Sequence, residues 1–161
     1  MKIINNVLCE IHRYEEDSFS VGEIIFINDN IIISKNIDPY GFYDGFRIEM
    51  LNFVSNISYN TDYINFLKKV RSNCVTELSF DSFDSFIENA INNDRLLSIS
   101  KKRWRTIKIV KILSNKSGIV TAEIINQCGK VKKLVNFNIQ EIKVLEYDTL
   151  ELRTYEKFLG L

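Results

Sequence analysis

The residues best suited to chemistry are few, and their spacing favours binding over catalysis. His12 is the single histidine and follows Cys9 by three positions, so a Cys–His pair can be imagined there. We expect a strand in this region, and residues three apart on a strand point to opposite faces. The sequence contains no glycine-rich phosphate loop, nucleophile elbow or metal-spaced His/Cys cluster. We therefore expect no enzyme, no cofactor and no metal site.

A basic segment surrounds the only tryptophan of the chain. Cations at this spacing could follow nucleic-acid phosphates, and an exposed tryptophan could stack on a base, contributing about 1–3 kcal/mol. If the segment instead alternates along a strand, its lysines face solvent and its isoleucines face a core. Both interpretations stay open. The candidate nucleic-acid-binding residues are Lys101, Lys102, Arg103, Trp104, Arg105 and Lys108.

The densest turn signal in the chain runs from Gly41 to Gly45. On such a loop, Tyr40, Tyr43 and Asp44 could contact a protein partner, because tyrosine offers a large apolar area with a polar tip. The alternative is a plain turn between two strands, in which glycine supplies the backbone geometry and Tyr43 packs over the end of a barrel.

Three carboxylates, Asp81, Asp84 and Glu88, lie at i, i+3 and i+7, which places them on one face of a helix. They could bind a cationic partner such as a basic nuclease. Alternatively, they lie at the start of a helix because negative charge is favourable at that end of the helix dipole. Three carboxylates on successive turns do not by themselves form the oxygen cage that a divalent cation requires.

The 21 basic and 21 acidic side chains cancel over the whole chain but not within its halves. Residues 1–94 carry 7 Lys and Arg against 15 Asp and Glu, a net charge of −8, and residues 95–161 carry 14 against 6, a net charge of +8. The balance argues against a uniformly basic nucleic-acid binder. The asymmetry predicts that the two halves do different jobs.

The three cysteines and the apolar runs bear on the cellular compartment. Cys9, Cys74 and Cys128 are odd in number and more than 50 residues apart, which fits reduced thiols and gives no zinc or redox spacing. No apolar run approaches the about 18 residues that a membrane span requires. We expect a cytoplasmic protein with no membrane association.

The elements that must position these residues are mostly strands. The chain has 24 Ile, 11 Phe and 7 Tyr but 2 Ala, which favours β structure. It also repeats itself at an offset of 88 residues: apolar, Gly, Tyr and Thr positions of 36–61 recur in 124–149. The expected strands are 7–14, 21–28, 31–37, 45–51 and 54–59 in the first copy and 96–101, 105–113, 118–126, 131–137 and 141–147 in the second.

The similarity of the two copies also predicts the length of one turn and the shape of each sheet. The turn at Ser114–Gly118 is expected to be two residues longer than the turn at Asn28–Asn30, a difference that a hairpin loop can absorb. Five short, bent strands would expose their edges as an open sheet, so each copy is expected to form a small, closed or partly closed β-barrel.

Helices are expected at 61–71, 82–92 and 149–159, each with a polar capping residue before an apolar stripe. The fold class is thus mainly β with minor α: two tandem five-stranded barrels, each followed by a short helix, plus a connecting helix. The expected domains are 1–74 (first barrel and its helix), 75–95 (helical connector) and 96–161 (second barrel and its helix).

The string from Gly41 to Phe46, followed by Ile57–Asn60 and a short helix, resembles bacterial proteins built from tandem Sm-like β-barrels. The likeness covers most of the chain, although the second copy has Lys130–Lys133 in place of the Tyr-Asp-Gly step. The chain also looks like immunity proteins of bacterial contact-dependent toxin systems, a likeness of size and composition without a motif.

These observations favour a non-catalytic, protein-binding module. The resemblance implies an immunity-type inhibitor that covers the active surface of a toxin, and the acidic first half would speed its encounter with a basic nuclease. The alternative is an Sm-like nucleic-acid binder that uses the basic second half. A third possibility is an oligomer in which the acidic half of one chain docks on the basic half of the next. We expect a monomer or a weak homo-oligomer.

Overall fold

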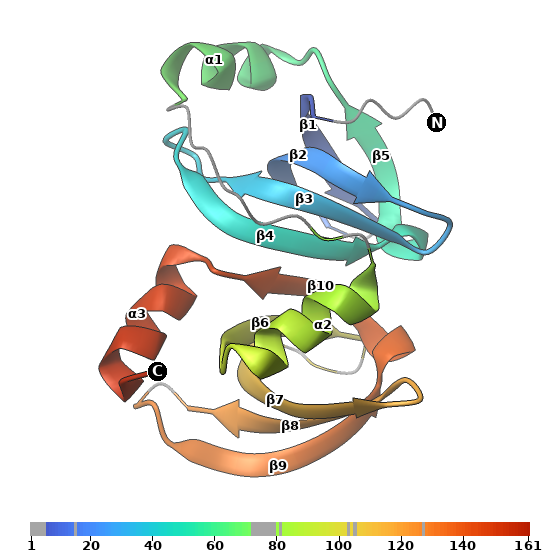
Figure 1. The fold of residues 1–161 in the computed structure, drawn as a ribbon. Coiled ribbons are helices and arrows are strands. Elements are labelled where there is room, and N and C mark those ends of the chain that lie inside the picture. The colour runs from blue at the N-terminus through green and yellow to red at the C-terminus, as the bar shows by residue number, and fades with distance from the viewer. Residues whose placement is uncertain are drawn as a thin grey trace. The chain divides into compact units, whose positions relative to one another are not determined.

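The computed structural model describes residues 6–14, 16–71, 80, 82–102, 104, 106–126 and 128–161. The chain divides into two compact units, Met1–Phe80 (unit 1) and Asp81–Leu161 (unit 2). The described residues contain ten strands and three α-helices, so the mainly β class expected from the sequence is confirmed (Figure 1).

Unit 1 contains β1 (Leu8–Arg13), β2 (Phe19–Ile27), β3 (Ile31–Ile37), β4 (Tyr43–Met50), the 3₁₀ turn η1 (Leu51–Phe53), β5 (Val54–Ser58) and α1 (Asp62–Val70). Unit 2 contains α2 (Phe83–Asn92), β6 (Leu96–Lys101), β7 (Lys108–Lys116), β8 (Ile119–Ile125), β9 (Val131–Asn138), η2 (Ile139–Glu141), β10 (Ile142–Tyr147) and α3 (Leu150–Leu159). Each of these strands and α-helices overlaps a segment expected from the sequence.

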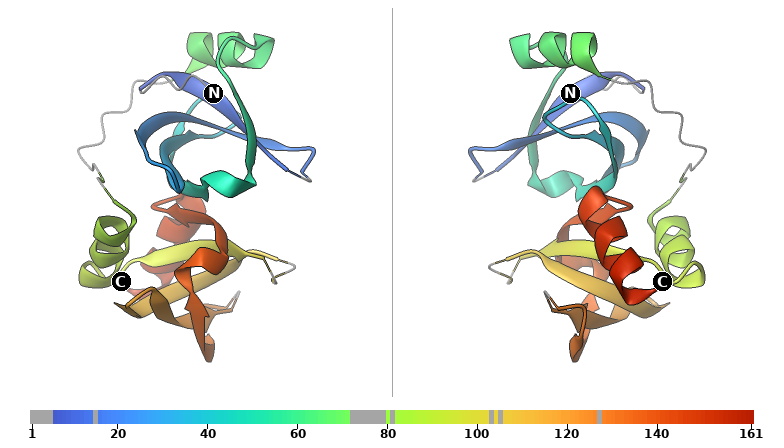
Figure 2. Two further views of the ribbon diagram at one scale, coloured as in Figure 1. Left: turned by 90° about the vertical axis from the view of Figure 1, so that its right-hand side faces the viewer. Right: turned by 90° about the vertical axis from the view of Figure 1, so that its left-hand side faces the viewer.

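The strands of each unit form a strongly curled antiparallel sheet. They pair in the order β5-β1-β2-β3-β4 in unit 1 and β10-β6-β7-β8-β9 in unit 2. In each unit a 3₁₀ turn joins the strand at one edge to the strand at the other edge. Three residues of 3₁₀ helix advance only about 6 Å, whereas a flat sheet of five strands is about 19 Å wide. The edges can therefore meet only if the sheet curls, as Figures 1 and 2 show.

The curl does not close into a hydrogen-bonded barrel within the described ranges. The strand pairing does not join β4 to β5 or β9 to β10. The two closed or partly closed barrels expected from the sequence are thus not confirmed, and the strand pairing leaves the curled sheet of each unit open. In each unit the 3₁₀ turn, η1 or η2, brings the two edge strands together at one corner, and beyond this corner the strands do not pair as neighbours in the sheet.

The strand register repeats at one constant offset of 88 residues. The register shift of β2 between Ile24 and Phe26 recurs in β7 between Ile112 and Ser114. A bulge at the same place in both sheets bends both in the same way. Pairs related by this offset include Leu8–Glu23 and Leu96–Lys111, Ile31–Met50 and Ile119–Asn138, and Glu10–Ser58 and Ser98–Glu146.

The expectation of a longer turn in the second hairpin is wrong. Residues 28–30 join β2 to β3, whereas β7 and β8 pair as far as Lys116 and Ile119, so the second turn is the shorter one. It consists of Ser117 and Gly118, with φ of 51° and 81°. Positive φ at both central residues is the geometry that suits a two-residue hairpin. The constant offset leaves no insertion to accommodate.

The helix that ends each unit is capped and packed in the same way. Thr61 accepts a hydrogen bond from the backbone N–H of Ile64 at the start of α1, and Thr149, 88 residues later, accepts one from Leu152 at the start of α3. The buried side of α1 packs on β1 and β2, and that of α3 packs on β6 and β8. Both helices therefore cover the same end of their curled sheet.

Helix α2 belongs to unit 2. It begins in a reciprocal capping arrangement between Ser82 and Ser85, and it packs against β7. The ring of Phe86 meets Tyr147 edge-on at 5.2 Å between centroids, and the Tyr147 hydroxyl donates to Asn89 Oδ1 at 2.9 Å. The acidic residues of this helix consequently lie in the same unit as most of the basic ones.

Candidate functional site

Each unit contains a cavity beside its last helix, and the repeat relates the two. The cavity of unit 1 is about 420 Å³ and is lined by residues 18–21, 36–39, 44, 47 and 63. The cavity of unit 2 is about 600 Å³ and is lined by residues 98, 106–109, 124–126, 128, 132, 146, 151 and 155. Nine of the eleven residues lining the first have a counterpart 88 positions later in the second. The two cavities are the same place in the fold.

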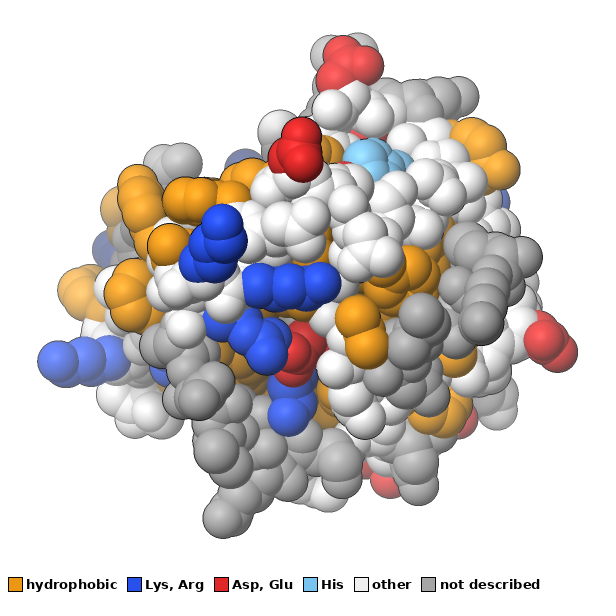
Figure 3. Space-filling view, turned by 90° about the horizontal axis from the view of Figure 1, so that it is seen from above, with side chains coloured by type: hydrophobic (Ala, Val, Ile, Leu, Met, Phe, Trp, Pro, Cys, Tyr) orange, Lys and Arg blue, Asp and Glu red, His pale blue; other side chains and the backbone are white. Residues whose placement is uncertain are grey.

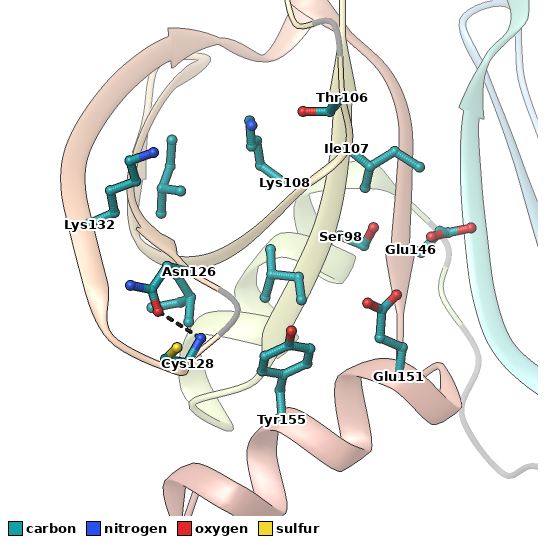
Figure 4. A pocket seen from close by; sticks show the side chains of 13 residues that line it. Ser98, Thr106, Ile107, Lys108, Asn126, Cys128, Lys132, Glu146, Glu151 and Tyr155 are labelled. Atoms are coloured by element: carbon teal, nitrogen blue, oxygen red, sulfur yellow. Dashed lines mark hydrogen bonds between the residues drawn. The ribbon is translucent and has the colours of Figure 1, made fainter.

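The unit-2 cavity lies in the hollow of the curled sheet, as Figure 4 shows. Strands β7, β8 and β9 curve around it, and α3 borders one side. Lys132 points inward from β9, and Tyr155 points into the hollow from α3 (Figure 4). Glu151 lies across the cavity from Lys132. The cavity therefore has a cationic wall and an acidic wall.

Equivalent positions in the two cavities carry different charges. Ser20 and Asp44 line the first cavity, and Lys108 and Lys132 occupy the same positions in the second. Within the described part of the chain, neither lysine forms an ion pair or a hydrogen bond. Two unpaired ammonium groups on one wall make that wall suited to an anion.

A turn of the same construction borders each cavity. One side-chain oxygen of Asp38 in unit 1, and of Asn126 in unit 2, accepts two backbone hydrogen bonds. Gly41 and Gly129 follow with φ of 88° and 72°. A Cβ at Gly41 would lie 2.9 Å from the Cα of Arg71, so the turn approaches the end of α1 too closely for a side chain.

The structure separates the partner-binding residues expected around this turn. Tyr40 is 76% exposed. Tyr43 is half-buried, with its ring edge-on to Phe46 at 5.8 Å between centroids. Asp44 lines the unit-1 cavity, because neighbouring residues on a strand face opposite sides. Tyr40 alone of these three presents most of its side chain to a partner.

The acidic residues expected to bind a cationic partner lie in the other unit. Asp84 and Glu88 are exposed on α2, and Asp84 Oδ1 accepts a hydrogen bond from Asn115 Nδ2 at 3.3 Å. Asp81 lies outside the described residues. Divided at residue 80, unit 1 carries 7 basic and 11 acidic residues, net −4, and unit 2 carries 14 and 10, net +4. The asymmetry is halved because the acidic segment 81–94 belongs to unit 2.

The basic segment packs against its own unit. Lys101 Nζ lies 5.0 Å from the ring centroid of Trp104 and 5.2 Å from that of Phe137, and it is 3.0 Å from Glu141 Oε2. The Trp104 and Phe137 rings meet edge-on at 5.8 Å, and Trp104 is half-buried. We call Lys101, Trp104 and Phe137 the Lys101 cluster. Lys102 is exposed, and Arg103 and Arg105 lie outside the described residues.

The Lys101 cluster has a counterpart in unit 1, 88 residues earlier. Arg13, Glu16 and Glu49, which we call the Arg13 cluster, are joined by bonds of 2.7 Å from Arg13 Nε to Glu16 and 2.9 Å from Arg13 Nη1 to Glu49. Burial disfavours the charged guanidinium, but Glu49 and Glu16 raise the pKa of Arg13 above its ordinary value. The same three positions thus form a side-chain cluster in both units, one ionic and one aromatic.

Cys9 and His12 do not form a catalytic pair. The Cys9 thiol is buried and donates to the carbonyl oxygen of Gly22 at 3.4 Å, whereas His12 Nε2 lies 3.0 Å from Glu10 Oε2 on the other face of β1. Burial, with smaller contributions from Glu49 and Glu10, raises the pKa of Cys9 to about 12. A thiol held neutral in this way is a poor nucleophile.

The buried thiol predicts a loss of stability at high pH. Between about pH 9 and 12 the unfolded chain releases the Cys9 proton while the folded chain keeps it, so folding stability falls by up to about 1.4 kcal/mol per pH unit. Below pH 9 this contribution is fully present. Urea denaturation from pH 8 to 11 should show the free energy of unfolding of the native chain falling towards that of Cys9→Ala. Parallel pH profiles for the two proteins would contradict the prediction.

Among the described residues there is no group of three or more His, Cys, Asp or Glu side chains arranged to hold a metal ion. In that same part of the chain, no helix has the length and apolar character needed to cross a membrane.

Comparisons with known proteins gave no match. No protein-family model, curated protein or solved structure matches this chain.

Proposed function

We propose that the face of unit 1 that carries α1, where exposed apolar side chains gather, is a protein-binding surface. Tyr63 links two of these side chains, with its ring 5.6 Å from that of Phe19 and 6.4 Å from that of Phe66. Gly41 lies against the end of this helix, and its two neighbours, Tyr40 and Phe42, are exposed on the same turn. Figure 3 views this face and shows hydrophobic side chains beside lysines and arginines. The α1 patch consists of Phe19 (38% exposed), Tyr40 (76%), Phe42 (58%), Phe66 (52%) and Val70 (46%).

We propose that this protein is a non-catalytic, protein-binding module that uses the α1 patch. The observation that carries the proposal is the gathering of four exposed aromatic rings from three separate segments. Aromatic residues are enriched at protein interfaces, and grouped exposed apolar side chains mark such surfaces more reliably than scattered ones. Each of these residues is more than a third exposed, so the fold of unit 1 leaves part of every ring available to a partner.

The immunity-type role implied by the sequence is one form of this proposal. An inhibitor of that kind would cover the active surface of a toxin with the α1 patch. Lys68 and Lys69 are exposed in the last turn of α1, beside the patch. The acidic surplus of unit 1 as a whole would attract a basic nuclease at long range. Burial of the aromatic rings would then hold the complex together.

Nucleic-acid binding through the basic segment has weaker support. Stacking on a base requires a free tryptophan face, but Trp104 packs against Phe137 and lies beside Lys101. The ammonium group of Lys101 is already paired with Glu141. The Lys101 cluster is accounted for by packing within unit 2.

Removal of two patch rings should abolish partner binding without unfolding the chain. The Phe42→Ser/Phe66→Ser variant is expected to recover at least about tenfold less of a partner that the native chain retains at equal stoichiometry, because buried aromatic anchors dominate interface energies. Affinity purification from the source cells, with quantitative mass spectrometry, measures the recovery. If the partner is a nuclease toxin, its activity should be lost in the complex.

Leu113→Ser/Ile119→Ser is the matched control, since both residues are similarly exposed apolar positions in unit 2. This variant should retain the partner, and both variants should keep the native melting temperature within a few degrees. Equal recovery by the patch variant, or no stoichiometric partner for the native chain, would rule the proposal out.

A further inference from the structure

We infer that the unit-2 cavity binds a small organic anion that is charged at one end and apolar in its body. Lys108 and Lys132 would hold the charged group, and the isoleucine floor of the cavity would hold the body. This site is separate from the α1 patch, which lies in the other unit. The inference therefore stands or falls independently of the proposed protein-binding function.

The equivalent cavity of unit 1 indicates that the two lysines serve to bind a ligand and not to stabilise the fold. Unit 1 forms the same curled sheet and the same cavity with Ser20 and Asp44 at the positions of Lys108 and Lys132. The fold thus has no need of a cation at either place. Two cations on one cavity wall repel each other, and no carboxylate of the described residues pairs with either one. A bound anion removes this repulsion and gains charge-assisted hydrogen bonds.

The size and lining of the cavity indicate what kind of ligand body it can hold. At about 600 Å³ the cavity falls in the range typical of small-molecule sites, and its lining combines four isoleucines with polar and charged side chains. Ile109, Ile124 and Ile125 provide the apolar floor, and Tyr155 presents its ring and hydroxyl from α3 (Figure 4). The unit-1 cavity is smaller, and its floor carries Asn36 where unit 2 has Ile124.

The acidic wall limits the ligand to one negative end. Glu146 and Glu151 line the cavity on the side away from Lys132 (Figure 4). A second negative group on the far end of the ligand would face these carboxylates and be repelled. A ligand with one anionic group and an apolar far end avoids that cost.

Nuclear magnetic resonance titration of the full chain tests the inference with four small probes. Benzoate and phenyl phosphate should produce saturable shifts of backbone amides that line the unit-2 cavity, and the tighter of the two identifies a carboxylate or a phosphate site. Benzyl alcohol, of similar shape without charge, should produce none. Terephthalate, with a second carboxylate facing the acidic wall, should bind several-fold more weakly than benzoate.

A pair of matched variants assigns the binding to the two lysines. Lys108→Ser/Lys132→Ser should weaken benzoate or phenyl phosphate binding by at least about tenfold, because a hydrogen bond to a charged group is lost at each position. Lys116→Ser/Lys133→Ser removes the same charge from exposed positions outside the cavity and should leave binding within about twofold. Both variants should keep the native amide spectrum elsewhere.

Four results would overturn the inference. They are the absence of saturable shifts with both anions, equal shifts with benzyl alcohol, an equal loss in the Lys116→Ser/Lys133→Ser control, and saturation by a single-stranded oligonucleotide where neither small anion saturates. The last result would assign the lysine wall to nucleic acid.

Discussion

Glu49→Ala should lower the free energy of unfolding by about 3–5 kcal/mol, the range for removal of one partner from a buried ion pair. Glu49 is fully buried on β4 and accepts hydrogen bonds from Arg13 Nη1 at 2.9 Å and from the Ser20 hydroxyl at 2.8 Å. The substitution leaves a largely buried guanidinium and a buried hydroxyl without their shared acceptor. Urea denaturation followed by far-ultraviolet circular dichroism measures the loss.

Glu16→Ala is the matched control, because it removes a different partner of the same arginine. Glu16 Oε2 lies 2.7 Å from Arg13 Nε, but its side chain is 40% exposed, and exposed pairs contribute about 0–1 kcal/mol. The Arg13 cluster is therefore expected to respond unequally to the loss of its two carboxylates. Equal effects of the two substitutions, or a loss below about 1 kcal/mol for Glu49→Ala, would show that burial does not govern the cluster.

The secondary structure of this protein could be predicted from its sequence because local patterns carry it. Alternating apolar residues and turn formers located the ten strands, and polar caps before apolar stripes located the three helices. The 88-residue repeat was also visible, since apolar character is conserved between the copies even where identity is low. Closure into barrels was not predictable in the same way, because it depends on how two 3₁₀ turns direct the edge strands.

The side-chain clusters and the cavities could not be predicted from the sequence, because they depend on the strand register. A second hairpin two residues longer would shift the alignment of the first strands of the two copies. Glu16 would then not align with Trp104. Under the constant offset, the lone tryptophan of the basic segment falls on a member of the Arg13 cluster and acquires a packing role. A basic stretch around a tryptophan suggests nucleic acid only while the positions that it occupies in the fold are unknown.

The replacement of Asp44 by Lys132 was visible in the sequence as a departure from the repeat. Its meaning was not, because the cavity wall also requires Lys108, and a longer second hairpin would align Lys108 with a residue other than Ser20. Several separate segments line each cavity, and none carries a recognisable motif. The two equivalent cavities therefore differ in charge at two positions, Ser20 against Lys108 and Asp44 against Lys132, that only the strand register brings together.

Arg95→Ala should lower the free energy of unfolding of unit 2 by about 3 kcal/mol, the lower end of the range for breaking a buried ion pair, since the arginine is 27% exposed. Arg95 joins the start of β6 to α3: its Nη2 lies 2.6 Å from Asp148 Oδ1 and its Nε lies 2.8 Å from Glu156 Oε1. Burial opposes its charge, but hydrogen bonds with Glu156 and Asp148 raise its pKa above the ordinary value. The fluorescence of Trp104, the only tryptophan, follows the unfolding of unit 2 during urea denaturation.

The control for this prediction shares a carboxylate with Arg95. Arg153 Nη1 lies 3.3 Å from Asp148 Oδ2 and its side chain is 39% exposed, so Arg153→Ala should cost about 1 kcal/mol or less. The difference arises at Glu156, which is buried and, among the described residues, keeps only the backbone N–H of Leu96 as a donor to its carboxylate once Arg95 is removed. A buried carboxylate with one donor in place of two is a destabilised group, so Arg95→Ala/Glu156→Gln should recover part of the loss. Additive effects in that double variant would mean that Arg95 acts through packing on Tyr147, whose ring centroid lies 5.1 Å from the guanidinium, and not through its charge.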